Sequence, residues 1–147
     1  MKAYEIQAGT QDLSGVRLVD RPDPKPGPRQ ILVRVKAASL NYRDLMIVSG
    51  AYFGGPVRRD TIPLSDGAGE VVEVGSEVTR FKQGDRVAST FFLGWVDGPS
   101  RLPPPTTHGG PVDGMLAEYA VLDEQDAVHV PAHLSFEEAA TLPCAAV

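Results

Sequence analysis

A short glycine-rich run, Leu64–Gly75, constrains the fold of this chain more than any other stretch. Dinucleotide-binding folds use the pattern G-x-G-x-x-G between a strand and a helix, where the third glycine lets the helix pack closely on the strand. Gly67 and Gly69 match the first two positions, but Val72 occupies the third. The overlapping segment Glu70–Val74 is rich in β-branched residues, which favour a strand over a helix. We therefore predict that these glycines relieve steric crowding at the start of a strand and bind no phosphate.

The size and charge of the chain exclude several classes of protein. With 147 residues, 42% of them hydrophobic, the chain suits one domain that buries roughly 68–70% of its unfolded surface. The net charge of −5 comes from interspersed charges, so no basic stripe for nucleic acid exists. No apolar run has the length of a membrane span, and the first residues lack the apolar core of a signal peptide. The single cysteine, Cys144, cannot form an internal disulfide, which suits a reducing cytoplasm. From charge, apolar runs and cysteine content together, we expect a cytoplasmic protein that binds neither nucleic acid nor membrane.

Most of the chain has the pattern of β-strands. Ile31, Val33 and Val35 recur with the period of two that is typical of a half-buried strand. The proline-rich segment 21–30 favours an extended connector over a sheet interior. The fold class is therefore predicted to be mostly β, as a partly open β-barrel with a few short helices. Further strands are predicted at 16–19, 70–74 and 86–88, and in the segments MLAEYAVL (115–122) and AVHVP (127–131).

Two short helices are predicted between the strands. The first begins after Asn41, a suitable N-cap, and ends at Gly50. The second begins with a capping box formed by Ser135 and Glu138, and Pro143 is expected to prevent its continuation.

The segment 96–114 shows the pattern of neither a strand nor a helix, and it is rich in proline and glycine. Its composition predicts a long surface loop. Loops of this length often close over ligands, and disorder is an equal alternative.

Four segments, taken in order, resemble the N-terminal catalytic domain of the medium-chain dehydrogenase/reductase superfamily. They are VRVKAASLNYRDLMIVSGAY, IPLSDGAGEVVEVGSEVTRFKQGDRV, GMLAEYAVL and FEEAATLPCAAV, and together they cover nearly the whole chain. The resemblance implies a GroES-like barrel over residues 1–134 and, over 135–147, the start of a connection to a Rossmann domain. That α/β domain, absent from this sequence, is expected to bind NADP or NAD and to provide the contacts of a homodimer.

The resemblance also identifies the positions at which zinc-dependent members hold their catalytic metal. Asn41 and Ser65 stand where those members have a cysteine and a histidine, Asp66 stands where they have a glutamate, and Cys144 retains the third ligand position. Catalytic zinc takes three ligands from Cys, His, Asp or Glu. The four-cysteine lobe for structural zinc is also absent, so no metal is expected.

Other metal-ligating or nucleophilic residues give weaker indications. His129 and His133 have H-x3-H spacing, but no C-x2-C pair accompanies them, and exposed histidines are the simpler interpretation. Cys144 as a nucleophile with His108 or His129 has no supporting local signature, and a small buried residue is the simpler interpretation.

This subgroup looks like the zinc-independent quinone oxidoreductases. Without a Lewis acid, the expected substrates are small carbonyl compounds or quinones whose developing charge delocalises. The resemblance assigns Asn41, Tyr42, Asp44 and Tyr52 to the catalytic cluster, and Asn41 also to the cofactor. Tyr52 would orient or protonate the acceptor, and a helix-capping role for Asp44 is an equal alternative.

Three aromatic residues, Phe91, Phe92 and Trp95, follow a predicted strand. Phe92 and Trp95 are the candidates for a substrate pocket, although such residues equally suit the barrel core or a contact with the second domain. The charged run 58–60 is expected to be a solvated loop.

Two other functions stay open from the sequence. One is a zinc-dependent activity on alcohols and aldehydes, as in the alcohol dehydrogenases. The other is a stand-alone GroES-like binding module without catalysis. We expect the 147 residues alone to fold but to be inactive, because no segment can bind a pyrophosphate.

Overall fold

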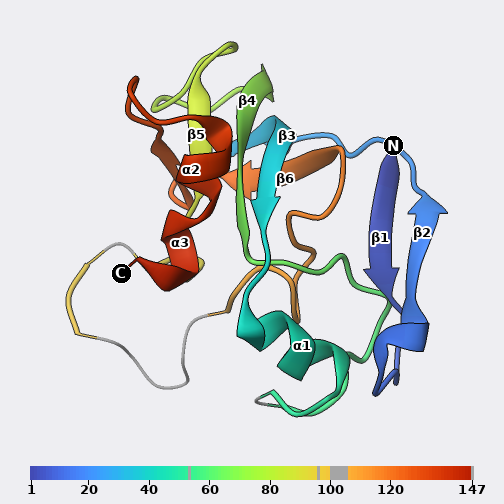
Figure 1. Ribbon diagram of the computed structural model, residues 1–147. Coiled ribbons are helices and arrows are strands. Elements are labelled where there is room, and N and C mark those ends of the chain that lie inside the picture. The colour runs from blue at the N-terminus through green and yellow to red at the C-terminus, as the bar shows by residue number, and fades with distance from the viewer. Residues whose placement is uncertain (53, 96, 100–105, 147) are drawn as a thin grey trace.

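The computed structural model describes residues 1–52, 54–95, 97–99 and 106–146. Figure 1 shows a curved sheet with short helices at one side and a separate hairpin at the other. The elements follow the order β1 (Lys2–Ile6), η1 (Leu13–Gly15), β2 (Val16–Asp20), β3 (Gln30–Ser39), α1 (Tyr42–Val48), β4 (Asp66–Val74), β5 (Arg86–Ser89), β6 (Tyr119–Asp123), β7 (Ala127–His129), α2 (Phe136–Ala140) and α3 (Leu142–Ala145).

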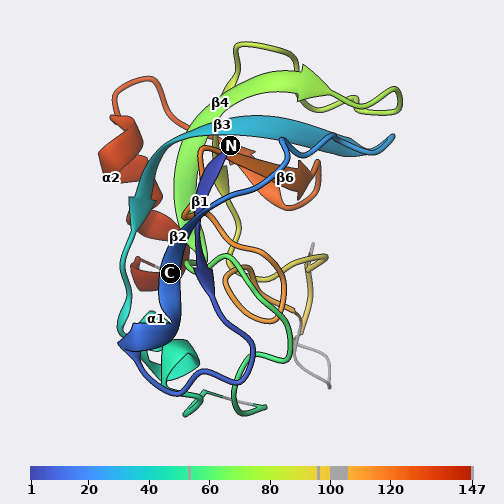
Figure 2. The same cartoon turned by 90° about the vertical axis from the view of Figure 1, so that its right-hand side faces the viewer.

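The large sheet has the strand order β6-β3-β4-β5-β7, and each neighbouring pair is antiparallel. Along β3 the register with β4 shifts between Leu32 and Val33 and again between Val35 and Ala37. Such irregularities bend a strand and increase its twist. Figure 2 shows the resulting curvature of β3 and β4, which curls the sheet into half a barrel. The predicted mostly β, partly open barrel is confirmed.

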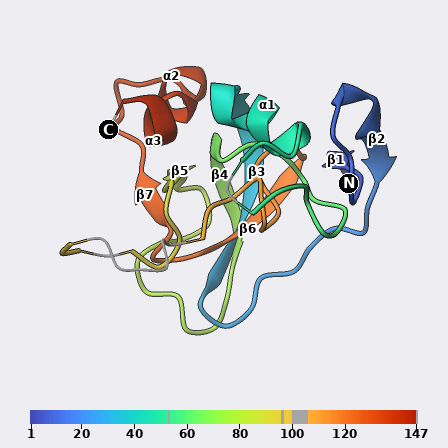
Figure 3. The same cartoon turned by 90° about the horizontal axis from the view of Figure 1, so that it is seen from below.

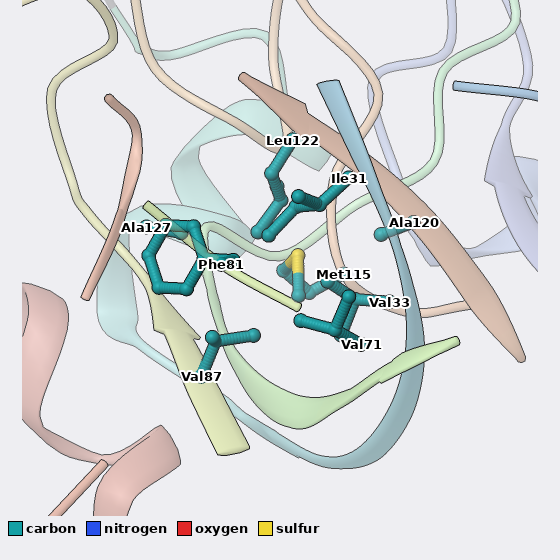
Figure 4. Close-up of a cluster of buried hydrophobic side chains, with 9 residues drawn as sticks. All are labelled: Ile31, Val33, Val71, Phe81, Val87, Met115, Ala120, Leu122 and Ala127. Carbon is teal, nitrogen blue, oxygen red and sulfur yellow. The ribbon is translucent and has the colours of Figure 1, made fainter. Parts of the chain in front are cut away.

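The barrel encloses a cluster of apolar side chains that come from the strands and from the segments between them (Figure 4). Met115 lies outside the strands and is only 1% exposed, so the interior is closed by loop residues as well as by strands. The cluster consists of Ile31, Val33, Val71, Phe81, Val87, Met115, Ala120, Leu122 and Ala127.

Gly67 and Gly69 of the glycine-rich run lie inside β4 at points of close packing. A Cβ atom on Gly69 would lie 2.2 Å from the carbonyl oxygen of Arg34 on the neighbouring strand β3. A Cβ atom on Gly67 would lie 2.7 Å from the Cβ atom of Met115. The strand continues to Val74, so no helix follows the glycines. The predicted steric role is therefore confirmed.

The hairpin of β1 and β2 contains a strand that the sequence analysis missed. β1 pairs with β2 in antiparallel register from Lys2 opposite Asp20 to Ile6 opposite Val16. Hydrogen bonds attach the hairpin to the rest of the domain, including Ile6 N–H to the carbonyl of Thr61 at 2.9 Å. The buried residues of β1, Ala3 and Ile6, are three apart, so the strand lacks the period of two.

The helices α1, α2 and α3 lie on one side of the large sheet (Figure 3). In the second capping box, Ser135 Oγ accepts from Glu138 N–H at 3.1 Å and Glu138 Oε2 accepts from Ser135 N–H at 2.7 Å. As expected, α2 does not continue through Pro143, because it ends at Ala140. Pro143 lies in the first turn of a separate short helix, α3, which was not predicted and in which a missing N–H costs no helical hydrogen bond. Within the part of the chain that the structure describes, no helix combines the length and apolar character of a membrane span.

The prediction of a surface loop at 96–114 is wrong for its second half. Thr107 and His108 are 7% and 5% exposed, and bridges join Thr107 to Phe92 and His108 to Val112. Residues 96 and 100–105 of this segment lie outside the described residues. The strand in MLAEYAVL is also shorter than predicted, because it begins at Tyr119.

Candidate active site

The first turn of α1 places the predicted residues Asn41 and Asp44 against each other. Asn41 is the N-cap, and its backbone N–H donates to Asp44 Oδ2 at 2.7 Å. The helix ends before Gly50, whose φ of 69° suits glycine. Asp44 is buried, and this burial raises the pKa of its carboxyl group, whereas the Asn41 hydrogen bond and the Arg43 charge oppose that increase. Asp44 therefore does cap α1, as the structural alternative predicted.

The neighbouring residue, Arg43, points into the protein and is only 7% exposed. Its guanidinium carbon lies 5.0 Å from the centre of the Tyr52 ring and 5.1 Å from the centre of the Phe91 ring. Both distances are within the range of a cation–π contact. Arg43 also lies 3.7 Å from Asp44 Oδ1. A buried cation therefore links the candidate catalytic residue Tyr52 to the aromatic residues that follow β5.

The same guanidinium holds the buried end of segment 106–114. Arg43 donates to Thr107 Oγ1 at 2.9 Å and to the carbonyl oxygen of His108 at 3.2 Å. The His108 Nδ1 atom lies 2.8 Å from the carbonyl oxygen of Asp113, so Nδ1 carries the proton and donates. Burial lowers the pKa of His108, which favours the neutral imidazole with an unprotonated Nε2.

An apolar cleft of about 580 Å³ lies between β5, β7 and the last two helices. Phe92 and Trp95 are 39% and 48% exposed and line it, so in the described structure they are surface residues and not barrel core. Phe91, Val128, Leu142 and Cys144 are among the other lining residues.

Cys144 is half-buried at the wall of this cleft, which corrects the interpretation of it as a fully buried small residue. Burial raises the pKa of its thiol, and the Asp66 carboxylate adds to the increase. The thiol is therefore protonated near neutral pH, which argues against a thiolate nucleophile.

Ser65, Asp66 and Cys144 form a hydrogen-bonded group, here called the Asp66 clasp, that includes two of the three positions at which the resemblance places zinc ligands, Ser65 and Cys144. Ser65 Oγ donates to Asp66 Oδ1 at 2.5 Å, and the backbone N–H of Cys144 donates to Asp66 Oδ2 at 3.0 Å. Ser65 and Asp66 are fully buried.

The three zinc-ligand positions, Asn41, Ser65 and Cys144, do not fit a catalytic zinc ion. Zinc takes thiolate, imidazole and carboxylate ligands, whereas these positions offer one thiol, a hydroxyl that already donates a hydrogen bond, and the amide of Asn41. Throughout residues 1–52, 54–95, 97–99 and 106–146, no three His, Cys, Asp or Glu side chains form a group suited to a metal ion. His129 and His133 are both exposed, in agreement with the simpler interpretation of this pair.

The residue before the clasp has a strained backbone. Leu64 has a φ of 71°, a conformation that is uncommon for a residue with a side chain. Neighbouring backbone encloses it, because a Cβ atom on Gly114 would lie 2.1 Å from the Leu64 carbonyl oxygen. Strain of this kind costs about 1–3 kcal/mol and is concentrated at functional sites. The packing around Leu64 therefore fixes the direction in which the chain passes through Ser65 into β4.

Around α1, four buried side-chain atoms lack a hydrogen-bond partner within the described structure. Buried polar groups are usually paired, so each exception indicates a possible contact with a ligand or water. The four atoms are Asn41 Nδ2, Arg43 Nε, Asp44 Oδ1 and His108 Nε2.

The structure brings only some of the predicted site residues together. Asn41 and Asp44 are in contact, and Phe92 and Trp95 share the cleft. Tyr52 lines a separate hollow with Pro56 and Gly110. Tyr42 is 78% exposed and faces a different groove, between α1 and the loop before β2, so it does not join the others. The charged run 58–60 is exposed, as predicted.

The sequence analysis missed Arg43 and Thr107, and it considered His108 only as a partner of Cys144. A signal for Arg43 was present, because Arg43 and Ile47 are four residues apart and therefore share one helical face. Ile47 is 4% exposed, so this face is buried. For Thr107 and His108 we find no comparable signal, because a Pro- and Gly-rich segment predicts exposure.

Comparison with known proteins agrees with this geometry. The family described as the alcohol dehydrogenase GroES-like domain matches residues 27–132. A zinc-type alcohol dehydrogenase-like protein of Schizosaccharomyces pombe is 48% identical over 124 residues, which are 84% of this chain and 36% of that protein. A quinone oxidoreductase of Pseudomonas aeruginosa is 41% identical over 119 residues, which are 80% of this chain and 30% of that protein.

Among solved structures, a crystal structure of an NAD-dependent alcohol dehydrogenase aligns with a TM-score of 0.86 and 33% identity, covering 97% of this chain and 43% of that one. The chain thus spans well under half of each of these proteins. It belongs to the alcohol dehydrogenase GroES-like domain family and corresponds to the N-terminal domain of the medium-chain dehydrogenases/reductases.

Proposed function

We propose that this chain is the substrate-binding part of an NAD(P)H-dependent oxidoreductase that reduces quinones or α,β-unsaturated carbonyl compounds without zinc. The observation that carries the proposal is the Asp66 clasp beside the apolar cleft. Where zinc would be ligated, Ser65 and the Cys144 backbone are engaged with Asp66. An acceptor bound there must stabilise its developing negative charge by delocalisation and by hydrogen bonds.

The cleft suits a flat apolar acceptor. Phe92, Trp95 and Val128 provide aromatic and aliphatic walls, and such walls with few polar groups are typical of small-molecule sites. The P. aeruginosa relative is named a quinone oxidoreductase, which supports the same class of substrate.

Nothing within the glycine-rich run fits a dinucleotide, so we place the cofactor on a Rossmann domain that follows residues 135–147. When bound, that cofactor would supply a hydride to the β-carbon of an enone. The residues of this chain would then stabilise the enolate oxygen by hydrogen bonds and deliver one proton to the α-carbon.

In this proposal Tyr52 supplies the proton. Its hydroxyl can donate, and its ring and that of the cleft residue Phe91 lie 5.0 and 5.1 Å from the same Arg43 guanidinium carbon. Because Tyr52 itself lines a separate hollow, a water molecule would relay the proton to the acceptor. Asn41, whose Nδ2 donors are buried without a partner, would bind the substrate or the cofactor amide. Asp44 holds Asn41 in place through its backbone N–H.

Steady-state kinetics test the proposal in an enzyme that joins this chain to its cofactor-binding portion. We expect a higher kcat/KM with duroquinone and with 3-penten-2-one than with butanal, and no loss of rate with 1,10-phenanthroline. Elemental analysis should find no stoichiometric zinc. A preference for butanal together with close to one zinc per chain would instead support the zinc-dependent activity that the name of the S. pombe relative suggests.

A further inference from the structure

The guanidinium of Arg43 is a fully charged group inside the protein, and burial of a charge needs compensation. Arg43 is 7% exposed, and its nearest carboxylate oxygen, Asp44 Oδ1, lies 3.7 Å away. The hydrogen bonds that it donates go to neutral oxygens, on Thr107 and His108. Within the described structure its Nε atom has no hydrogen-bond partner. An ion pair at this distance compensates a buried cation only in part, so a purely structural role does not account for the burial of this charge.

The position of the guanidinium matches a role in arranging aromatic rings. The rings of Tyr52 and Phe91 each lie about 5 Å from its central carbon, at 5.0 and 5.1 Å. A planar guanidinium can stack on ring faces, whereas the compact ammonium of lysine cannot do so in the same way. Phe91 forms part of the wall of the cleft, and Tyr52 is the candidate proton donor.

Arg43 also joins segments that are far apart in the sequence. It belongs to α1, it contacts Phe91 after β5, and it donates to Thr107 and His108, more than 60 residues later. Loss of the guanidinium would therefore remove the contacts with Tyr52, with Phe91 in the cleft wall and with Thr107 and His108 at the same time.

We propose that Arg43 is a positioning residue of the candidate active site, which fixes the Tyr52 ring relative to Phe91 and to the apolar cleft. The proposal rests on the proposed function in one respect, namely that this cleft takes a flat apolar acceptor. The position of the Tyr52 ring itself does not depend on that function.

The first measurement is the affinity of the cleft in the purified 147-residue chain. Trp95 is the only tryptophan and lines the cleft, so quenching of its fluorescence reports binding there. Duroquinone is a suitable probe, because its ring is fully methylated and the Cys144 thiol cannot add to it. We expect Arg43→Met, which removes the charge, and Arg43→Lys, which keeps it, each to weaken binding by about tenfold.

The second measurement follows the Tyr52 ring without any ligand. In a chain labelled with 3-fluorotyrosine, the ¹⁹F resonance of Tyr52 is assigned by its loss in Tyr52→Phe. We expect this resonance to move in Arg43→Met and in Arg43→Lys. The matched control is Arg80→Met, because Arg80 also lies over a ring, that of Phe81 at 5.3 Å, and donates to the carbonyl of Glu124. In this control neither the resonance nor the affinity should change.

The two measurements separate the proposal from the function on which it rests. If the wild-type chain does not bind duroquinone, the proposed substrate class loses support and the ¹⁹F resonance alone decides the role of Arg43. An unchanged Tyr52 resonance in folded Arg43→Met and Arg43→Lys chains overturns the proposal. Circular dichroism establishes that each variant is folded. Thr107→Val removes the acceptor of one Arg43 hydrogen bond, together with the donor to the Gly110 carbonyl, and provides a milder variant should both Arg43 variants fail to fold. In Thr107→Val we expect a smaller shift of the same resonance, and no shift overturns the proposal.

Discussion

The barrel interior and the region around α1 are both buried, yet they differ in whether their buried polar groups have hydrogen-bond partners. The interior is a cluster of apolar side chains, and the buried Ser65, Asp66 and Ser89 beside it are hydrogen-bonded to one another or to the backbone. Around α1, by contrast, Asn41, Arg43, Asp44 and His108 each have a buried polar atom without a partner. Unpaired polar groups cost stability, so they are expected where a ligand or a mechanism needs them. The interior thus accounts for the stability of the domain, and the region around α1 is the better candidate for function.

The largest expected effect is on the interior, from Gly69→Ala. The new Cβ atom would lie 2.2 Å from the Arg34 carbonyl oxygen, which is backbone and cannot rotate away. We expect the free energy of unfolding to fall by about 3 kcal/mol or more, as measured by urea denaturation.

Gly27→Ala is the control for this change. There the added Cβ atom would approach only the flexible side chain of Gln30, at 3.1 Å, so stability should change little. Equal stabilities of Gly69→Ala and Gly27→Ala would refute the close-packing explanation of the glycine-rich run.

On the functional side of the comparison, the largest effect is expected from Tyr52→Phe in the enzyme with its cofactor-binding portion. The change removes one hydroxyl group, so folding should be preserved. If this hydroxyl donates to the acceptor, kcat with an enone should fall on the order of 10²-fold.

Thermal unfolding measured alongside separates this effect from a loss of structure. Wild-type kcat in a Tyr52→Phe enzyme of unchanged Tm would remove Tyr52 from the mechanism and direct the search to Phe92 and Trp95 in the cleft.

The difference between the two regions also decides what could be predicted from the sequence. The interior follows local rules: alternation at Ile31 and Val33 predicts β3, and the capping box at Ser135 predicts α2. The residues at the zinc-ligand positions could likewise be compared with the ligands of zinc-dependent members, because the side-chain chemistry of Ser65 and Cys144 is known from the sequence alone.

The region around α1 depends on contacts that no local pattern contains. His108 is buried, and Arg43, 65 positions earlier, donates to its carbonyl group. Composition alone predicts exposure for such a segment. Tyr42 shows the converse, because the resemblance assigns it to the same cluster as Asn41, yet a helix turns adjacent residues to different faces.

A smaller effect is expected from the pH dependence of stability, through His108. Burial lowers its pKa below the value of 6.5 of an unfolded chain, so between these two values the unfolded state binds more protons than the folded state. The contribution of neutral His108 to stability is therefore fully present above about pH 7. As the pH decreases below 6.5, this contribution is lost, and the free energy of unfolding falls by at most about 1.4 kcal/mol per pH unit.

His108→Asn isolates this contribution, because the Asn side chain can still donate to the Asp113 carbonyl but does not titrate. The nearby Asp126, whose pKa burial raises, has the opposite dependence and is present in both proteins. We expect a shallower loss of stability between pH 7 and pH 5 in His108→Asn than in the wild type, measured by urea denaturation. The exposed His133→Asn should behave like the wild type, and identical slopes in all three proteins would contradict the buried neutral imidazole.

The smallest expected effect concerns Cys144, which lies where the two regions meet. Its pKa is raised first by burial and then by the Asp66 carboxylate, so at pH 8 less thiolate is present than in a free cysteine derivative. Iodoacetamide should therefore alkylate Cys144 more slowly than it alkylates N-acetylcysteine, as followed by mass spectrometry. Asp66→Asn removes the charge and retains an oxygen that can accept from the Cys144 N–H, so alkylation should become faster. The increase should be less than about tenfold, because burial, the larger cause, remains. A rate that Asp66→Asn leaves unchanged, in a protein with the wild-type Tm, would mean that the Asp66 clasp holds the backbone of Cys144 without acting on its thiol.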